Sequence, residues 1–306
     1  MDNYSSSCCI SVRLKLMRKK TNFGDLPDEY ASLEQAEIVI LPVPYDATST
    51  WQKGADKGPE ALIEASRHME LYDIETDSQV YLKGIFTAEP VVVNKSPEKM
   101  VESVETAVRL YLEKNKFVVV VGGEHSVSTG SVKAHLDRHK NFTVLQLDAH
   151  SDLRDEYEGS KYNHACVMAR ISEMCPIVQV GIRSMDYSEK PALDLGRVFF
   201  AERIQDNTEW IQKVLFQLTE KVYITIDLDV FDPSIMPSTG TPEPGGLLWY
   251  NVLMLLKAVF DDKEVVGFDV VELCPDERNK APDFLAAKLI YKLLTNKYFR
   301  IDKERI

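Results

Sequence analysis

Residues 142–152 read FTVLQLDAHSD, a largely apolar run that ends in residue types able to bind a metal ion. Asp148, His150 and Asp152 alternate with small residues directly after the run. If the strand continued or only just ended there, side chains at i, i+2 and i+4 would face one side and converge. The stretch therefore predicts a buried strand with three candidate metal ligands at its carboxyl end.

Two further runs end in the same way. The run KVYITI at 221–226 precedes Asp227 and Asp229, and the run FVVVV at 117–121 precedes His125. Runs that are apolar at almost every position are typical of parallel strands covered by helices on both faces. Ligands of such sheets bind beyond the carboxyl ends of the strands. We therefore expect the three clusters to meet at one edge of a sheet.

A Gly-Gly pair and a carboxylate add to these clusters. Gly122 and Gly123 separate the run at 117–121 from His125, and their missing side chains allow a tight turn and close approach of another backbone. Glu272 follows a fourth strand-like run. A polar residue after a strand is usually a turn or helix cap, but several metal-binding clusters at strand ends are hard to produce by accident.

The clusters supply two imidazoles and four aspartates as candidate ligands: His125, Asp148, His150, Asp152, Asp227 and Asp229. This set holds too many oxygens for one zinc ion and suits a pair of bridged divalent ions. By contrast, His68, His135 and His139 lie in helix-like, charge-rich surroundings and are expected to be solvated or packed. The sequence thus favours a two-metal hydrolase.

The remaining sequence alternates strand-like and helix-like segments. Further strands are expected at 37–43, 176–180, 199–200 and 264–271, and helices from 59 and near 165, and over 97–114, 130–139, 210–220, 250–260 and 283–294. Residues 233–246 are rich in proline and glycine and form a loop long enough to wall a site. This alternation, without a repeat or linker, predicts one α/β domain over 21–306, with a mostly parallel sheet between two layers of helices.

Composition narrows the classes of function. The 306 residues, 44% of them hydrophobic, can bury a full core, and no segment is long and apolar enough to cross a membrane. A net charge of −12 without a basic stripe argues against nucleic acid and favours cationic small molecules. Five scattered cysteines fit the reduced thiols of a cytoplasmic protein.

Residues 1–20 differ from the remainder of the chain. They are polar and then basic, and they lack the apolar segment of a secretory signal. We expect a flexible or oligomer-docking arm, or a segment that precedes a true initiator at Met17.

The motifs, in their order, resemble those of the ureohydrolase family, the arginases and agmatinases, over residues 35–300. The matching segments are GGEHS at 122–126, DAHSD at 148–152, IDLDVFDPS at 226–234, GTPEPGGL at 240–247 and DVVE at 269–272. The resemblance implies the arginase/deacetylase-like fold and two manganese ions per chain. One ion would be held by His125, Asp148, Asp152 and Asp227. The other would be held by Asp148, His150, Asp227 and Asp229.

The resemblance also implies a catalytic histidine at His164 and a guanidinium-binding carboxylate at Glu272. The carbon of a guanidinium group is a poor electrophile, so its hydrolysis needs the hydroxide that metal ions provide near neutral pH. Four carboxylates offset the charge of two divalent ions and favour manganese, although cobalt, iron or zinc would fit the same set. Glu272 would hold the planar guanidinium by paired hydrogen bonds, and His164 would pass a proton to the departing amine.

The loop LRDEYEGSKYNHAC at 153–166 resembles that of the agmatinase branch. It lacks the Thr/Ser/Asn-rich stretch by which arginases hold an α-carboxylate. The acidic residues Asp155, Glu156 and Glu158 would suit a cationic tail, and Asn163 is expected to bind substrate beside them. The leading prediction is therefore hydrolysis of agmatine to putrescine and urea, a step of polyamine biosynthesis, by a cytoplasmic homo-oligomer, either a trimer or a hexamer.

Several alternatives stay open at this stage. An arginase, a guanidinobutyrase or a formimidoylglutamase would share the metal ligands and differ only in the loops around the substrate tail. A mononuclear zinc amidohydrolase of the deacetylase fold would need an Asp-x-His pair but not all six ligands. A non-catalytic ligand-binding relative would show a broken ligand, and none is broken. Asp186 either lies where arginases keep an aspartate near the α-amino group or is a surface turn residue.

Overall fold

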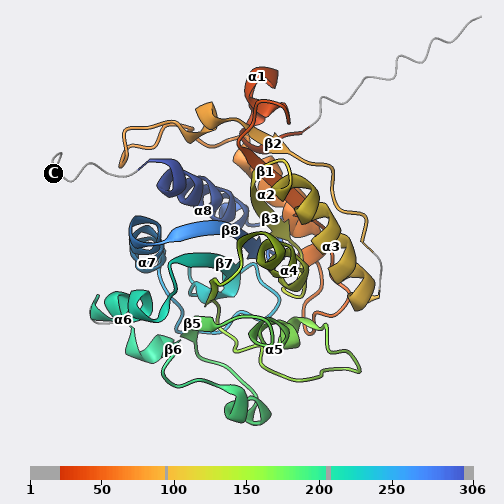
Figure 1. Cartoon of the computed structure of the whole chain (residues 1–306), viewed down its shortest axis with the longest axis vertical. Coiled ribbons are helices and arrows are strands. Elements are labelled where there is room, and N and C mark those ends of the chain that lie inside the picture. The colour runs from red at the N-terminus through yellow and green to blue at the C-terminus, as the bar shows by residue number, and fades with distance from the viewer. Residues whose placement is uncertain (1–20, 94–95, 205–207, 300–306) are drawn as a thin grey trace, which may run out of the picture.

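A computed structural model describes residues 21–93, 96–204 and 208–299 of the chain (Figure 1). The predicted arm at 1–20 lies outside the described residues. Eight strands form one sheet in the order β2-β1-β3-β8-β7-β4-β5-β6, and every neighbouring pair is parallel. The predicted α/β fold with a parallel sheet between helices is therefore confirmed.

The inner strands are mostly apolar and are buried along almost their whole length, as expected for strands between two helical layers. The strands are β1 (Ile38–Val43), β2 (Ile85–Thr87), β3 (Phe117–Gly122), β4 (Thr143–Leu147), β5 (Ile177–Ile182), β6 (Val198–Phe200), β7 (Lys221–Asp227) and β8 (Glu264–Val271). All but β2 lie where the sequence predicts them. The edge strand β2 was missed because three residues are too few to show a period.

The helices are α1 (Asp28–Ala31), α2 (Gly58–Ser66), α3 (Pro97–Leu112), α4 (Val127–His139), α5 (Val167–Ser172), α6 (Glu209–Gln217), α7 (Trp249–Asp262) and α8 (Ala281–Tyr298). Proline in the first turn starts α2, α3 and α8, because its fixed φ suits that position and the helix needs no N–H there. Three helices are longer than predicted: α4 begins at 127 rather than 130, α7 covers 249–262 rather than 250–260, and α8 covers 281–298 rather than 283–294.

The core divides into two faces of the sheet. On one face, α2, α6, α7 and α8 pack in a single cluster against alternate residues of β1, β3, β7 and β8. On the other face, α3, α4 and α5 cover the intervening residues. Each fully buried Leu or Val side chain contributes about 1.5–3 kcal/mol relative to its exposed state, so both layers hold the strands in register.

The strand order places the motifs side by side. Strands β3, β8, β7 and β4 are consecutive in the sheet, so their carboxyl ends form one edge. His125, Glu272, Asp227 and Asp148 follow or end these strands in that order. Motifs far apart in the sequence therefore become neighbours across the sheet.

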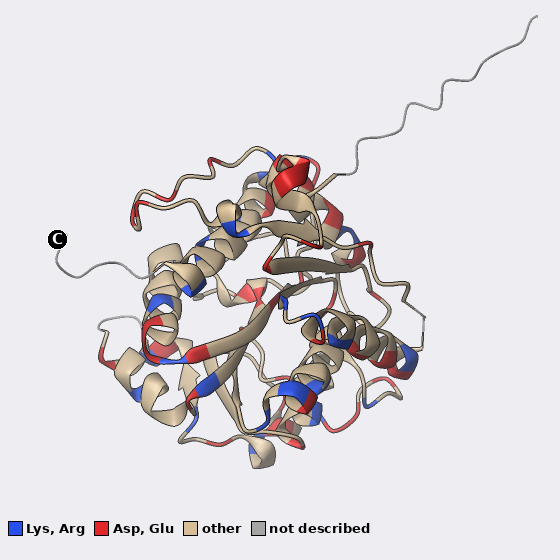
Figure 2. Cartoon of the chain, turned by 45° about the horizontal axis from the view of Figure 1, so that its top comes forward, with Lys and Arg blue, Asp and Glu red and all other residues tan. Residues whose placement is uncertain are grey.

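In the ribbon of Figure 2, Lys and Arg are interspersed with Asp and Glu along helices and loops. Among the described residues, no helix combines the length and the apolar character needed to cross a bilayer.

Candidate metal centre and active site

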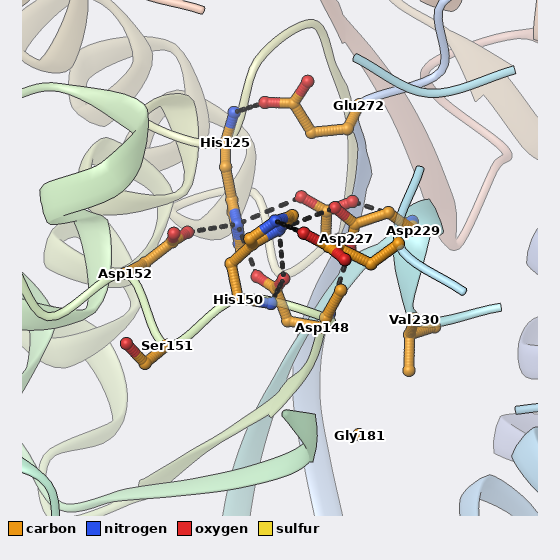
Figure 3. A network of polar contacts seen from close by, with 12 residues as sticks. His125, Asp148, His150, Ser151, Asp152, Gly181, Asp227, Asp229, Val230 and Glu272 are labelled. Atoms are coloured by element: carbon orange, nitrogen blue, oxygen red, sulfur yellow. Dashed lines mark hydrogen bonds and ion pairs between the residues drawn. The ribbon is translucent and has the colours of Figure 1, made fainter. Parts of the chain in front are cut away.

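The first group of candidate ligands surrounds the imidazole of His125 (Figure 3). Its Nδ1 lies 3.1 Å from Asp148 Oδ2 and 3.1 Å from Asp152 Oδ2. Asp227 Oδ2 is 3.5 Å from the same nitrogen. All four side chains are buried, so electrostatic interactions among them are much stronger than in water.

The second group shares Asp148 with the first. His150 Nδ1 lies 2.9 Å from Asp229 Oδ2 and 3.7 Å from Asp148 Oδ1. Asp227 links the two groups, because its Oδ1 accepts the N–H of Asp229 at 2.9 Å while its Oδ2 lies beside His125. The structure thus brings all six predicted ligand residues together. Five of them form two groups that could each hold a metal ion: His125, Asp148 and Asp152, and Asp148, His150 and Asp229.

The three residues after β4 converge by a turn, so of the two predicted alternatives the strand has just ended and does not continue. The strand ends at Leu147, and Asp148 Oδ1 accepts the N–H of His150 at 2.6 Å. Between these two residues, the N–H of Ala149 donates to Asp229 Oδ1 at 2.9 Å, which connects this turn to the residues that follow β7. Asp152 then adopts a left-handed φ of 52°. Short carboxylate side chains favour such turns because they bond the backbone two residues ahead.

The hydrogen bond at Nε2 of His125 indicates whether Nδ1, the nitrogen that faces the carboxylates, is available to bind a metal ion. Its Nε2 lies 2.8 Å from Thr225 Oγ1, and the Thr225 hydroxyl donates to Asp269 Oδ1 at 2.6 Å. Because that hydroxyl proton is used, Nε2 must carry the imidazole proton and donate it to Thr225. The lone pair of a neutral imidazole at Nδ1 would then face three carboxylate oxygens, and Nδ1 has no hydrogen-bond partner of good geometry among the described residues. Although burial opposes protonation, Asp148 and Asp152 raise the pKa of His125, so a proton takes this place when no metal ion is bound. A cation between them would turn this repulsion into coordination, so the residues fit a metal.

Two of the ligand carboxylates, Asp152 and Asp227, also show the effect of crowding in their pKa values. Burial raises the pKa of Asp152 to about 7, and the charge of Asp148 adds to the rise. Burial also raises the pKa of Asp227 well above its usual range, with further contributions from Asp229 and Asp148. Crowded carboxylates resist ionising together unless positive charge compensates them. Divalent ions would supply that charge.

A cavity of about 310 Å³ opens over the ligands and also exposes the two predicted catalytic residues. Glu272 enters it from the end of β8 with a left-handed φ of 67°, and its Oε1 accepts the N–H of His125 at 2.7 Å. The other oxygen, Oε2, keeps its full capacity for a ligand. His164 also lines the cavity, and its pKa is lowered to about 4, mainly by burial and further by the positive charges of His150 and His125.

Comparison with known proteins identifies the family. The sequence profile of the Arginase family matches residues 36–295. The chain belongs to the arginase family. Over 277 residues it is 43% identical to the N(1)-aminopropylagmatine ureohydrolase of Synechocystis sp., which covers 86% of this chain and 90% of that protein. It is 33% identical over 272 residues to the agmatinase of Pyrococcus horikoshii, covering 86% of this chain and 92% of that protein.

A solved structure supports the same assignment. The agmatine ureohydrolase of Thermoplasma volcanium matches with a TM-score of 0.80 and 30% identity, covering 92% of this chain and 96% of that one. The predicted family, the arginase-like fold and the prediction of a ureohydrolase enzyme are therefore confirmed.

The predicted tail-binding residues of this arginase-family chain do not reach the cavity, which corrects that part of the prediction. Asp155 is 75% exposed in its side chain and pairs with Arg170 of α5 at 2.8 Å and with Lys161 at 3.4 Å. Exposed Glu158 lies in the same loop with a left-handed φ of 49°. Asn163 is buried and accepts the N–H of Ala165 at 3.0 Å, where it caps a short 3-10 turn. Glu156 is exposed as well.

Three other residues of this arginase-family chain line the cavity, and the part that they form is called the tail side below: Arg154, Tyr157 and Asp186. The Arg154 guanidinium lies over the ring of Tyr157 at 4.4 Å, and that ring meets His164 edge-on at 6.2 Å between centroids. Asp186 Oδ2 is 3.8 Å from Arg154 Nη2. Asp186 also caps the 3-10 turn Tyr187–Ala192, as the turn alternative predicts, and it lines the cavity; its part in binding an amine stays a prediction.

A row of buried polar residues beneath the site was missed. Gln179, Gln146, Thr225 and Asp269 occupy registered positions on β5, β4, β7 and β8. Gln146 Nε2 donates to Asp148 Oδ2 at 2.7 Å, and Gln179 Nε2 donates to Gln146 Oε1 at 2.6 Å. The signal was present in the sequence, because each is a polar residue in a strand that is otherwise apolar.

Proposed function

We propose that this chain is a binuclear manganese ureohydrolase that releases urea from an amine-tailed guanidine, either N1-aminopropylagmatine or agmatine. The observation that supports the metal pair is the bare Nδ1 of His125, which faces Asp148, Asp152 and Asp227 while Asp148 also serves the group of His150 and Asp229. Donors of this kind, rich in carboxylate oxygens, favour a hard ion such as manganese.

The metal pair would be held by the six ligands named above and would lower the pKa of bound water, which supplies a nucleophile near neutral pH. Glu272 Oε2 accepts N–H groups of the planar guanidinium and orients its carbon toward the ligands. Water adds to this carbon, the bond from carbon to the tail nitrogen breaks, and urea and an amine result. His164, which also lines the cavity, delivers the proton that the departing amine needs.

The amine tail is supported by the cavity and by the relatives. Asp186 lines the cavity beside Arg154 and Tyr157, and it would pair with an ammonium group of the substrate. Glu189 lines the cavity as well, but it already accepts hydrogen bonds from Ser151, Leu153 and Asp186. The relative at 43% identity acts on N1-aminopropylagmatine and the one at 33% on agmatine, by their names. We therefore place N1-aminopropylagmatine first. Its hydrolysis would give urea and the aminopropyl derivative of putrescine.

A carboxylate-tailed guanidine is the second candidate, because Arg154 also lines the cavity. Its guanidinium is, however, already stacked on Tyr157 and faces Asp186. A substrate carboxylate would have to displace Asp186 to reach it, so guanidinobutyrate is the weaker candidate.

The test is urea release by manganese-reconstituted protein from N1-aminopropylagmatine, agmatine, guanidinobutyrate and arginine. We expect kcat/KM for the better amine-tailed substrate to exceed that for arginine by about 10² or more, the ratio given by roughly 3 kcal/mol of discrimination. Equal or faster turnover of guanidinobutyrate would assign the chain to another branch. The role in polyamine biosynthesis, the cytoplasmic location and the trimeric or hexameric assembly stay predictions.

A further inference from the structure

A threonine hydroxyl lies between the cavity histidine and a buried carboxylate that the sequence analysis gave no role. Thr48 Oγ1 donates to Glu124 Oε1 at 2.7 Å. The same oxygen accepts the backbone N–H of His164 at 3.0 Å and lies 3.4 Å from His164 Nδ1. Glu124 is fully buried, and Thr48 is nearly so. The three residues come from three separate segments: the loops after β1 and β3, and the loop before α5.

The count of protons at Thr48 fixes the roles of its partners. A threonine hydroxyl has one proton and two lone pairs. Its proton goes to Glu124, and one lone pair accepts the N–H of His164. Only a lone pair remains for His164 Nδ1, so Nδ1 must be the nitrogen that carries a proton. Nε2 of a neutral His164 is then the nitrogen with a free lone pair.

The backbone around Thr48 is built to hold the hydroxyl in this place. Asp46 Oδ2 accepts the N–H of Gly54 at 2.6 Å, and its Oδ1 accepts the hydroxyl of Ser49, which closes the loop 46–54. Glu124 N–H donates to Tyr45 O at 2.8 Å, so the loops after β1 and β3 pair directly. A side chain at Gly123 would meet Tyr45 O at 2.0 Å, so only glycine permits this approach.

The carboxylate of Glu124 is also held in place by hydrogen bonds from backbone N–H groups. Its Oε1 also accepts the N–H of Thr48 at 3.3 Å, and its Oε2 accepts the N–H of Ser126 at 3.0 Å. The carboxylate therefore cannot turn away from Thr48 without leaving buried N–H groups unpaired, which costs about 1–3 kcal/mol for each group.

We propose that Thr48, anchored by Glu124, is the positioning residue of His164: it holds the imidazole in the tautomer with the proton on Nδ1 and keeps Nε2 for proton exchange in the cavity. This inference rests on the proposed function, in which His164 hands a proton to the departing amine. With the tautomer fixed, Nε2 can take up a proton in the cavity and release it to the amine while Nδ1 stays bonded. In the opposite tautomer, Nε2 would already carry a proton and could not accept one from the reacting groups.

The first test compares three variants of the full-length, manganese-reconstituted enzyme. Thr48→Val removes the hydroxyl at nearly constant shape, and Thr48→Ser restores it. Thr143→Val is the matched control, because Thr143 is a buried threonine bonded to Thr219 at the amino end of β4, far from the cavity. We expect Thr48→Val to lower kcat about 10- to 100-fold, as loss of an outer partner does, with manganese content and KM near wild type. Thr48→Ser should recover most of kcat, and Thr143→Val should lose little.

The second test observes the tautomer itself. Full-length chain labelled with 15N-histidine and loaded with zinc, which is diamagnetic, gives two-bond proton–nitrogen correlations that identify the protonated ring nitrogen. The His164 signals are those that vanish in His164→Asn. We expect the Nδ1–H tautomer in wild type and in Thr48→Ser, and a mixture or the Nε2–H tautomer in Thr48→Val.

The outcomes separate this inference from the proposed function. An Nε2–H tautomer in wild-type protein, or an unchanged kcat in Thr48→Val, would overturn the positioning role even if the enzyme releases urea efficiently. If wild-type protein released urea from no guanidine, the proposed function would fall. The proton count at Thr48 would still be judged by the correlation spectra.

Discussion

The metal side and the tail side of the cavity are built from different parts of the fold. On the metal side, the ligands extend from adjacent strand ends, and Asp148, Asp227 and Asp229 are almost completely buried. On the tail side, Arg154, Tyr157 and Asp186 come from loops and remain partly exposed. The metal-side ligands are held in place by the ends of the strands and by hydrogen bonds between the turns that follow them. The second set depends on contacts between loops, which makes it the place where related enzymes can differ in substrate.

The sharpest test of the metal side is the carboxylate shared by both groups. Asp148→Asn should lose both ions and lower urea release by more than the 10- to 100-fold that loss of an outer partner costs. Asp229→Ala touches only the second group and should leave about one tightly held ion. Elemental analysis of manganese-reconstituted protein decides between these results. Two retained ions in Asp148→Asn would contradict the shared-ligand arrangement.

The next test removes the cavity histidine without touching a ligand. His164→Asn should keep both ions and lower kcat by about 10² to 10⁴, because the residue acts in turnover and not in metal binding. Its pKa near 4 in the fold means that it is neutral at pH 7 in the absence of substrate, so the variant should not change the charge of the resting site. Loss of metal in this variant would show that His164 is a ligand or a structural support.

Sequence reasoning succeeded where local pattern determines position. Runs of buried apolar residues fixed the strands, so residues directly after them, such as His125 and Asp227, could be assigned to one edge. The same reasoning failed for Asp155, because its position depends on an ion pair with Arg170, fifteen residues away in α5. No local sequence pattern indicates this ion pair. The partner of His164, Thr48, lies 116 residues away in sequence and was equally out of reach.

Some signals were visible but were not used or left an alternative open. Gln146 and Thr225 interrupt apolar strands, and a buried polar side chain in such a place requires a partner. For the residues after Leu147 the sequence left open whether the strand continues or has just ended, since alternation of Asp148, His150 and Asp152 matches an extended chain as well as a turn. The side-chain bond from Asp148 to the N–H of His150 decides between them, and it requires the structure.

The row beneath the metal side gives a smaller expected effect. Thr225→Val removes the acceptor of His125 Nε2 and should weaken manganese binding about 10- to 100-fold, because an outer partner no longer fixes the imidazole. Thr143→Val, at the opposite end of the sheet, is the matched control and should bind manganese normally. Titration of metal-free protein with manganese measures both. Equal affinity in the two variants would mean that the ligands hold their positions without this row.

The smallest expected effect lies on the tail side and compares two aspartates directly. Asp186 lines the cavity, whereas Asp155 pairs with Arg170 and is not among the cavity-lining residues. Neutralising each in turn compares the proposed tail site with the one that the sequence predicted. Because Asp186 is partly exposed, its pair with a substrate ammonium is worth about 1 kcal/mol at most. Asp186→Asn should therefore raise KM for the amine-tailed substrate up to about 5-fold, with kcat little changed and KM for guanidinobutyrate unchanged or lower. Asp155→Asn should leave KM for both substrates at the wild-type value. A rise of KM in Asp155→Asn, with none in Asp186→Asn, would show that the loop at 153–166 turns toward the substrate during binding and would restore the tail assignment made from the sequence.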